Sequence, residues 1–217
     1  MRIGIFGGTF DPVHSAHIQM ALYARSILGL DKTFLVPTRP WQKTARASDA
    51  DRLNMLRLAT SDYSTELSVD SCELDRAGAS YSIDTLYSFR KEFGEDAELF
   101  FIMGGDQWKN LTTWIQWEKF PLLTNIALFR RNGELINSPY GNEFPVIELT
   151  QKLVSCGPCG TIYTIDEDVE SVSSSQIRKA LYTEPARSEP IAGLEESVHK
   201  YILANDLYLP REGSNYI

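Results

Sequence analysis

A glycine pair followed closely by two histidines, all within the first seventeen residues, constrains this chain more than any other feature. Residues 2–6 form a short apolar run with the β-branched and aromatic content of a buried strand. After residues 7–17, which read Gly-Gly-Thr-Phe-Asp-Pro-Val-His-Ser-Ala-His, helical spacing begins at Ile18, Ala21, Leu22, Arg25 and Leu28 and ends at Gly29. The pattern predicts a strand, a glycine turn and the N-terminus of a helix.

Such a junction suits an anion, because free backbone N–H groups and the positive end of a helix dipole meet there. Gly7 and Gly8 have no Cβ, so a phosphate can approach the backbone closely. His14 and His17 are three residues apart and share one face of a helical first turn. Each feature alone is ordinarily a turn or a cap; together they indicate phosphate chemistry. No Lys follows the glycines as in a Walker A loop, and the spacing fails the dinucleotide fingerprint.

Residues 7–17 resemble the phosphate-binding signature G-x-F-x-P-x-H-x-G-H of the nucleotidyltransferase superfamily. The Gly-Gly-Thr-Phe-Asp-Pro form resembles the bacterial nicotinate mononucleotide adenylyltransferase family in particular, with Ala16 where Gly is usual. The resemblance implies an α/β fold, a Rossmann-like doubly wound parallel sheet with helices on both faces and a small C-terminal helical part. It also implies that ATP is bound by Gly7, Gly8, Thr9 and Phe10, with His14 and His17 as catalytic residues.

Length and composition indicate one domain over residues 1–217, with 132–160 resembling an insertion and 170–208 the C-terminal helical part. The net charge of −8, from 21 Lys and Arg against 29 Asp and Glu, disfavours a nucleic-acid partner. No signal peptide and no apolar run near the ~20 residues of a membrane span is apparent. We therefore expect a cytoplasmic protein with no membrane contact.

The three cysteines argue against a disulfide framework. Cys156-Gly157-Pro158-Cys159 matches the thioredoxin-type motif, but a strand-like run follows it rather than a helix. A zinc site would need further ligands, and we expect no protein metal site. A Gly-Pro turn flanked by cysteines is favoured over a redox role.

Residues 33–36 predict a second strand, which with the first strand and helix implies a parallel sheet. The polar, basic stretch 38–47 follows at its carboxyl end, and a helix begins after Ser48 as N-cap. Related adenylyltransferases often carry Pro-Pro-His-Lys here, so the resemblance implies that Lys43 holds the triphosphate. The alternative is a solvated lysine in a loop.

Residues 67–70 predict a third strand, and residues 76–86 run from a glycine turn into a helix that Ser80 can cap. This stretch resembles the family's R-x-G-x-S-Y-x-x-D-T-L, which holds the nicotinate end of the substrate. The resemblance thus places Ser80, Tyr81 and Thr85 around nicotinate mononucleotide, with Thr85 at its carboxylate. It also implies that the pyridine ring stacks on Trp114, whereas Trp114 and Trp117 by spacing alone predict a packed helix face.

The most apolar strand is predicted at residues 98–103, and Gly104-Gly105-Asp106 follows it. A carboxylate at the carboxyl end of a strand suits a ribose hydroxyl. After this strand the Gly-x-Asp pattern resembles that of the family, and the resemblance implies that Gly104 and Asp106 join the ATP site. A further strand at 125–129 precedes Arg131, which matches a substrate-binding arginine of the family. Residues 132–160 are rich in Pro, Gly and Asn, with one short helix expected near 146–153.

A second anion site is predicted at residues 173–178, where three serines precede an arginine by one turn. Hydroxyls, N–H groups and a guanidinium gather there. It resembles the superfamily's I-S-S-T-x-I-R, and the resemblance assigns Ser173, Ser174 and Ser175 to ATP and Arg178 to catalysis. A closing helix is expected over 194–208, with His199 structural.

The resemblance implies transfer of AMP from ATP to nicotinate mononucleotide, with Mg²⁺ carried by the ATP phosphates. No protein nucleophile is required, because the acceptor's phosphate is already anionic. Two alternatives remain: a sister transferase such as a pantetheine-phosphate adenylyltransferase or a cytidylyltransferase, or a thiol redox or nucleotide-sensing module using Cys156 and Cys159. The sequence leaves oligomeric state open.

Overall fold

The computed structural model describes residues 1–39, 45–130, 137–166, 171–184 and 187–209. Within them, one seven-stranded sheet has the order β3-β2-β1-β4-β5-β7-β6, and every neighbouring pair is parallel. The strands are β1 Arg2–Gly8, β2 Lys32–Pro37, β3 Leu67–Val69, β4 Glu98–Gly104, β5 Asn125–Arg130, β6 Val146–Glu148 and β7 Ile162–Asp166. The helices are α1 Ser15–Leu28, α2 Asp49–Ala59, α3 Cys72–Asp75, α4 Ser82–Phe93, α5 Gly105–Lys109, α6 Phe120–Leu123, α7 Ser174–Leu181 and α8 Glu196–Ala204. Short 3₁₀ turns are η1 Ser61–Tyr63, η2 Leu111–Thr113 and η3 Trp117–Lys119.

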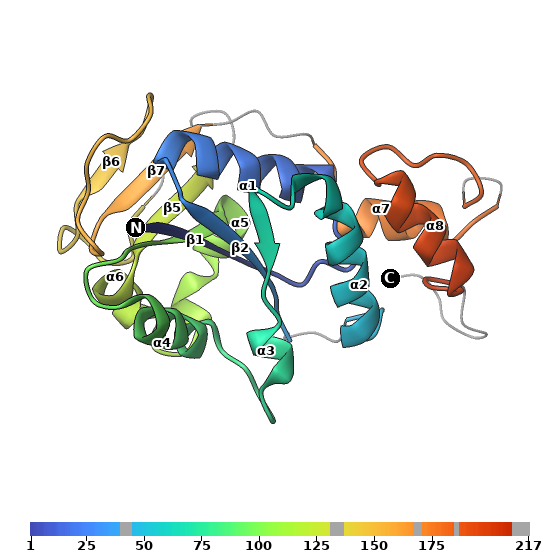
Figure 1. Ribbon diagram of the computed structural model, residues 1–217, viewed down its shortest axis with the longest axis horizontal. Helices are drawn as coiled ribbons and strands as arrows, with labels where there is room; N and C mark the ends of the chain where they lie inside the picture. Colours follow the sequence, from blue (N-terminus) through green and yellow to red (C-terminus); the bar gives the residue numbers. More distant parts are fainter. Residues whose placement is uncertain (40–44, 131–136, 167–170, 185–186, 210–217) are drawn as a thin grey trace.

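Helices cover both faces of the sheet, because successive strand residues point to opposite sides. In β4, Phe100 and Ile102 belong to a core shared with α1, α2, α7 and α8. Leu99, Phe101 and Met103 belong to a second core shared with α4, α5 and α6. Figure 1 shows α1 and α4 on opposite sides of the sheet. The predicted α/β class with a doubly wound parallel sheet is confirmed.

The strand order reverses at β1, which lies between β2 and β4. Phe6 pairs in register with Ile102, so the ends of these two strands lie side by side, with Gly7 and Gly8 on one and Gly104 on the other. Open α/β sheets bind ligands at such a switch point, outside the carboxyl ends of the strands.

Local signals set several helix ends where the sequence predicts them. Gly29 ends α1 with φ of +63°, a left-handed conformation that favours glycine. The Ser48 hydroxyl accepts the N–H of Asp51 at 3.1 Å as the N-cap of α2. Ser173 caps α7 in the same way through the N–H of Gln176 at 3.3 Å.

Four local predictions are wrong. The glycine pair belongs to β1, so the turn begins only at Thr9. Ser80 does not cap α4, since Tyr81 occupies the N-cap position. Trp114 follows η2 and Trp117 begins η3, so the two rings do not share a helix face. In place of the helix expected near 146–153, residues 146–148 form strand β6. This strand pairs with β7 at the edge of the sheet.

The C-terminal part packs as helices, as expected, but α8 is shorter than the predicted 194–208. Figure 1 shows α7 and α8 grouped at the end of the molecule beside α2. His199 is buried, and its Nε2 lies 2.8 Å from the carbonyl oxygen of Arg187, which supports the structural role. No helix in the described ranges has the length and apolarity to span a bilayer.

Candidate active site

The turn after β1 is built around the buried ring of Phe10. Phe10 has φ of +47°, an uncommon and strained conformation for a non-glycine residue. A Cβ on Gly8 would lie 2.8 Å from that ring, so Gly8 is required by packing. A Cβ on Gly7 would meet no atom closer than 3.6 Å. The ring of Phe10 is therefore committed to packing, whereas a Cβ on Gly7 would make only ordinary van der Waals contact with Thr38 and Phe101.

The two histidines form a stacked pair, with ring centroids 3.7 Å apart and planes 26° apart. His17 Nδ1 accepts the backbone N–H of His14 at 3.3 Å, so the proton of the neutral ring sits on Nε2. Burial, and then the neighbouring His14, lower the pKa of His17 well below 6.5. At neutral pH His17 is therefore an uncharged ring with one N–H to donate.

The start of α1 offers fewer backbone donors than expected. The Ser15 N–H donates to the carbonyl of Gly193 at 2.8 Å, and the His17 N–H donates to the carbonyl of His14 at 2.9 Å. These two N–H groups are therefore committed to backbone carbonyls, which leaves the imidazoles as the candidate donors at this junction.

The second predicted motif packs directly on the first. Arg178 Nη1 donates to the carbonyl oxygen of Asp11 at 2.6 Å, and the Ser174 hydroxyl donates to that of Pro12 at 2.8 Å. Arg178 Nη2 also donates to the hydroxyl of Ser175 at 3.1 Å. Ser173 and Ser175 are exposed at this start of α7. The two predicted phosphate motifs thus form one surface.

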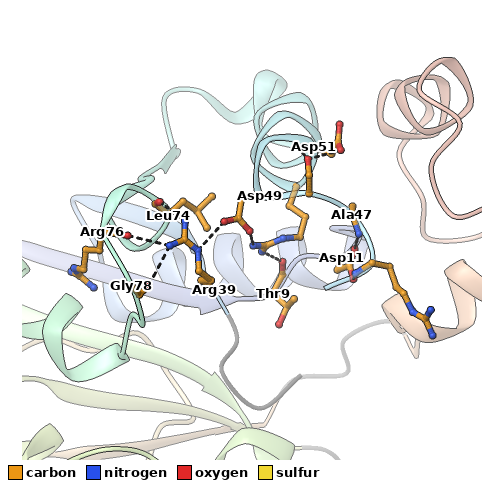
Figure 2. A network of polar contacts seen from close by, with 12 residues as sticks. Thr9, Asp11, Arg39, Ala47, Asp49, Asp51, Leu74, Arg76 and Gly78 are labelled. Atoms are coloured by element: carbon orange, nitrogen blue, oxygen red, sulfur yellow. Dashed lines mark hydrogen bonds and ion pairs between the residues drawn. The ribbon is translucent and has the colours of Figure 1, made fainter. Parts of the chain in front are cut away.

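Asp11 is a residue whose importance the sequence interpretation missed. Its buried carboxylate accepts the N–H groups of Arg46 at 2.7 Å and Ala47 at 3.1 Å, and the hydroxyl of Tyr208 at 2.8 Å. Figure 2 shows Asp11 facing Ala47. The side chain therefore fixes the turn to the start of α2 and to the C-terminal part. Its place between Phe10 and Pro12 in the motif was the available signal.

A pocket of about 300 Å³ opens beside this turn and contains most of the predicted acceptor residues. Its lining is Gly7, Gly8, Thr9, Thr38, Arg39, Glu73, Ser80, Tyr81, Ser82, Phe101, Gln107, Asn110, Trp114, Ile115 and Phe120. The predicted contacts Ser80, Tyr81 and Trp114 are among these residues. Ser82, the first residue of α4, lies there as well and was missed, although a helix start was predicted nearby.

Thr85 does not belong to this lining. It is buried, and its hydroxyl donates to Glu73 Oε1 at 2.7 Å and accepts from Arg76 Nη1 at 2.9 Å. Arg76 Nη1 also donates to the Ser80 hydroxyl at 2.9 Å. Burial raises the pKa of Glu73, which is the one carboxylate among the described residues that line the pocket. Thr85 therefore supports the pocket wall instead of facing a ligand.

The other predicted residues are placed unevenly. Gly104 ends β4 beside the switch point, whereas Asp106 is exposed on α5 and outside the pocket lining. Lys43 and Arg131 lie outside the described residues.

The Cys-Gly-Pro-Cys segment is a structural turn at the opposite end of β4. The carbonyl of Pro158 accepts the N–H of Leu99 at 3.2 Å and Nη2 of Arg90 at 3.1 Å. Burial and a hydrogen bond to Glu98 raise the pKa of Cys156 to about 12, so its thiolate is disfavoured. In the part of the chain that is described, no three His, Cys, Asp or Glu side chains cluster as a metal site.

Comparison with known proteins matches residues 5–180 to a family model described as cytidylyltransferase-like. A relative from Pseudomonas putida named "Probable nicotinate-nucleotide adenylyltransferase" is 36% identical over 211 residues, covering 95% of this chain and 94% of the relative. A relative of the same name from Neisseria meningitidis serogroup A is 34% identical over 209 residues, covering 95% and 98%. The fold is similar to Plasmodium falciparum nicotinic acid mononucleotide adenylyltransferase complexed with NaAD, with a TM-score of 0.75, 20% identity, and 95% and 97% of the two chains covered.

Proposed function

The chain belongs to the nicotinate-nucleotide adenylyltransferases of the cytidylyltransferase-like family, and we propose from this membership that it joins ATP to nicotinate mononucleotide. The products are nicotinate adenine dinucleotide and pyrophosphate, in a step of NAD biosynthesis. The observation that carries the proposal is the contact of Arg178 with Asp11, which unites the two phosphate motifs beside the pocket.

The reaction forms one P–O bond and breaks another. A phosphate oxygen of the acceptor attacks the α-phosphorus of ATP, and the bond between the α-phosphorus and the bridging oxygen to the β-phosphate breaks. The electron pair leaves with pyrophosphate. No proton must be abstracted, so the protein's contribution is alignment and stabilisation of charge on the leaving group.

Three side chains are suited to that charge. His17 can donate its Nε2–H to a phosphate oxygen, with the ring oriented by the N–H of His14. His14 stacks on it. Arg178 uses two N–H groups on Asp11 and Ser175, and a guanidinium has five, so it retains donors for an anion. Lys43 stays a proposal from the sequence alone.

The pocket supports an acceptor with a pyridine ring and a carboxylate. Trp114 supplies an aromatic face for stacking. The start of α4 at Ser80–Ser82 presents hydroxyls and the positive end of a helix dipole to an acid group. Arg76 can only donate, so the Ser80 hydroxyl accepts from it and keeps its own hydrogen to donate elsewhere.

Nucleotidyltransferases of this family typically use Mg²⁺ with ATP, and we propose that the ion enters on the ATP phosphates. The donor set fits this, because imidazoles, serine hydroxyls and a guanidinium surround the motifs, and the described residues contain no carboxylate cluster for a metal. The ion would neutralise charge on the β- and γ-phosphates. We also propose a cytoplasmic location.

The test is acceptor choice. With ATP and Mg²⁺, the chain is offered nicotinate mononucleotide, nicotinamide mononucleotide or phosphopantetheine, and pyrophosphate and the dinucleotide are quantified. Nicotinate mononucleotide should support the fastest release, with nicotinate adenine dinucleotide formed in equal amount. Faster release with phosphopantetheine, or with CTP replacing ATP, would assign the chain to a sister activity.

A further inference from the structure

We propose that Arg39 is a positioning residue that fixes the acceptor side of the pocket to the phosphate-binding turn; this inference rests on the proposed function. Arg39 follows β2 by two residues and lines the pocket. The family resemblance assigned no role to it, and its contacts extend in two directions.

Toward the acceptor side, the Arg39 guanidinium holds the backbone from the end of α3 to the loop before Ser80. Nη2 donates to the carbonyl of Leu74 at 2.7 Å, and Nη1 donates to those of Arg76 at 3.1 Å and Gly78 at 3.3 Å. Figure 2 shows these three carbonyls converging on Arg39. Gly78 has φ of +81°, so the loop turns sharply where Arg39 holds it.

Toward the phosphate side, Arg39 reaches the turn through two further charged residues. Its Nε donates to Asp49 Oδ2 at 2.9 Å, and Asp49 Oδ1 accepts from Arg52 Nη2 at 2.7 Å. Arg52 Nη1 donates to the carbonyl of Thr9 at 2.6 Å. Figure 2 shows Asp49 beside Arg39, with Thr9 near them. Although burial raises the pKa of Asp49, hydrogen bonds from Arg52 and Arg39 hold it below its usual value.

The held loop carries Arg76, whose side chain donates to the hydroxyls of Ser80 and Thr85. A shift of the loop would therefore move the hydroxyl of Ser80 as well as the start of α4. In-line transfer requires the acceptor phosphate and the α-phosphate to be aligned, and small misplacements are costly. The contacts from Gly78 to Thr9, through the side chains of Arg39, Asp49 and Arg52, thus connect the acceptor side of the pocket with the phosphate-binding turn.

The residue type fits this role. A guanidinium presents several donors in a fixed plane, whereas an ammonium is a point charge that cannot span an aspartate and three carbonyls. The side chains of Arg39 and Asp49 are 36% and 39% exposed, so their ion pair adds little to global stability. Water can also solvate the carbonyls when Arg39 is removed. Loss of Arg39 should consequently affect geometry more than folding.

The experiment compares Arg39→Met and Arg39→Lys with Arg57→Met. Arg57 is an exposed arginine on α2 outside the pocket lining, so replacing it with Met removes the same charge at a different place. Arg39→Met should raise KM for nicotinate mononucleotide and lower kcat, with a combined loss in kcat/KM on the order of tenfold or more. Arg39→Lys should lose less kcat/KM than Arg39→Met but should not reach the value of the unmodified chain. In Arg39→Met the Kd for a non-hydrolysable ATP analogue should stay within about twofold and the Tm within a few degrees of the unmodified chain. The kinetic constants of Arg57→Met should also stay within about twofold of the unmodified chain.

Two readouts separate positioning from general damage. Millimolar ethylguanidinium should partly restore kcat/KM in Arg39→Ala but not alter Arg57→Ala. Hydrogen exchange of the free protein should accelerate in residues 74–82 of Arg39→Met and stay unchanged in α4 beyond residue 86. An unchanged exchange rate in 74–82, kcat/KM within twofold of the unmodified chain, or an equal loss in Arg57→Met overturns the inference. If the unmodified chain forms no dinucleotide at all, the proposed function fails, and the exchange measurement still decides the link by itself.

Discussion

Arg178 Nη1 lies 2.6 Å from the carbonyl oxygen of Asp11, although 167 residues separate them in the chain. The contact places the start of α7 against the turn after β1. Both predicted phosphate motifs therefore contribute to one surface at the switch point of the sheet, and the substitutions below address that surface and its pocket.

His17 is best tested with a matched pair of amides. Asn in place of His17 can still accept the N–H of His14 but has no donor at the position of Nε2, whereas Gln places an amide N–H close to it. We expect His17→Asn to lower kcat on the order of 10²-fold and His17→Gln to lower it less. Steady-state kinetics with saturating ATP measures this, and near-normal turnover of His17→Asn would remove His17 from the mechanism.

The ring of His17 also packs on Phe10, with centroids 5.0 Å apart, so His17→Ala opens a gap. The sequence predicts that this change leaves folding nearly unaffected; the packing instead predicts a lower Tm for His17→Ala than for either amide.

Stability should depend on pH through His17. Burial, with His14 nearby, keeps the folded pKa of His17 below the unfolded value of about 6.5. As pH falls below that value, the unfolded chain binds a proton that the folded chain does not. The contribution is fully present above 6.5 and is lost as pH falls toward the folded pKa. The free energy of unfolding, measured with urea at pH 7.5, 6.5 and 5.5, should show this decline. It should depend less steeply on pH in His17→Asn, and an equal pH dependence in the two proteins would contradict the pKa shift.

Trp114 should act on both pyridine acceptors alike. Stacking does not distinguish a carboxylate from an amide, so Trp114→Ala should raise KM for nicotinate and nicotinamide mononucleotides by similar factors. Trp117 packs against Tyr140 at 5.1 Å and is outside the pocket lining, which makes Trp117→Ala the control. If Trp114→Ala changed KM for the two acceptors by different factors, the pyridine ring would not be stacked on Trp114.

The preference for nicotinate should reside at the start of α4. Donors at Ser80–Ser82 that face an amide NH₂ are mismatched, which costs a few kcal/mol, or on the order of 10²-fold in kcat/KM. Ser82→Ala should reduce that preference. Thr85→Ala should reduce it through Arg76 and Ser80 rather than by direct contact, so its effect should be smaller. Equal kcat/KM for the two acceptors in the unmodified chain would refute the assignment.

Replacing both Cys156 and Cys159 with Ser should leave adenylyl transfer within a few-fold, because the segment is a turn and the raised pKa of Cys156 disfavours a thiolate. Activity assayed under reducing and oxidising conditions checks this. A rate that follows oxidation state in the unmodified chain, and not in the double variant, would favour the redox alternative.

Strong local patterns predicted most of the fold. Apolar runs such as 98–103 became central strands, and capping residues such as Gly29 and Ser48 set helix ends, because their conformational preferences act within a few residues. Residues 146–148 form a strand where a helix was predicted. Their short apolar pattern suited helix or strand, and pairing of Ile147 with Tyr163 in β7 selected the strand.

The sequence by itself determined the class of fold and predicted the two phosphate motifs, since both depend on periodicity and on residue types at fixed local spacing. Only the tertiary structure decided which side chains face the pocket. The Thr85 hydroxyl donates to Glu73, the Phe10 ring is buried in the core, and the Ser15 N–H donates to the carbonyl of Gly193. Arg39 and Asp11 form hydrogen bonds with segments distant in the sequence. A hydrogen-bonding group takes whichever partner the packed chain brings within about 3 Å, and that choice is made between segments that no local pattern relates.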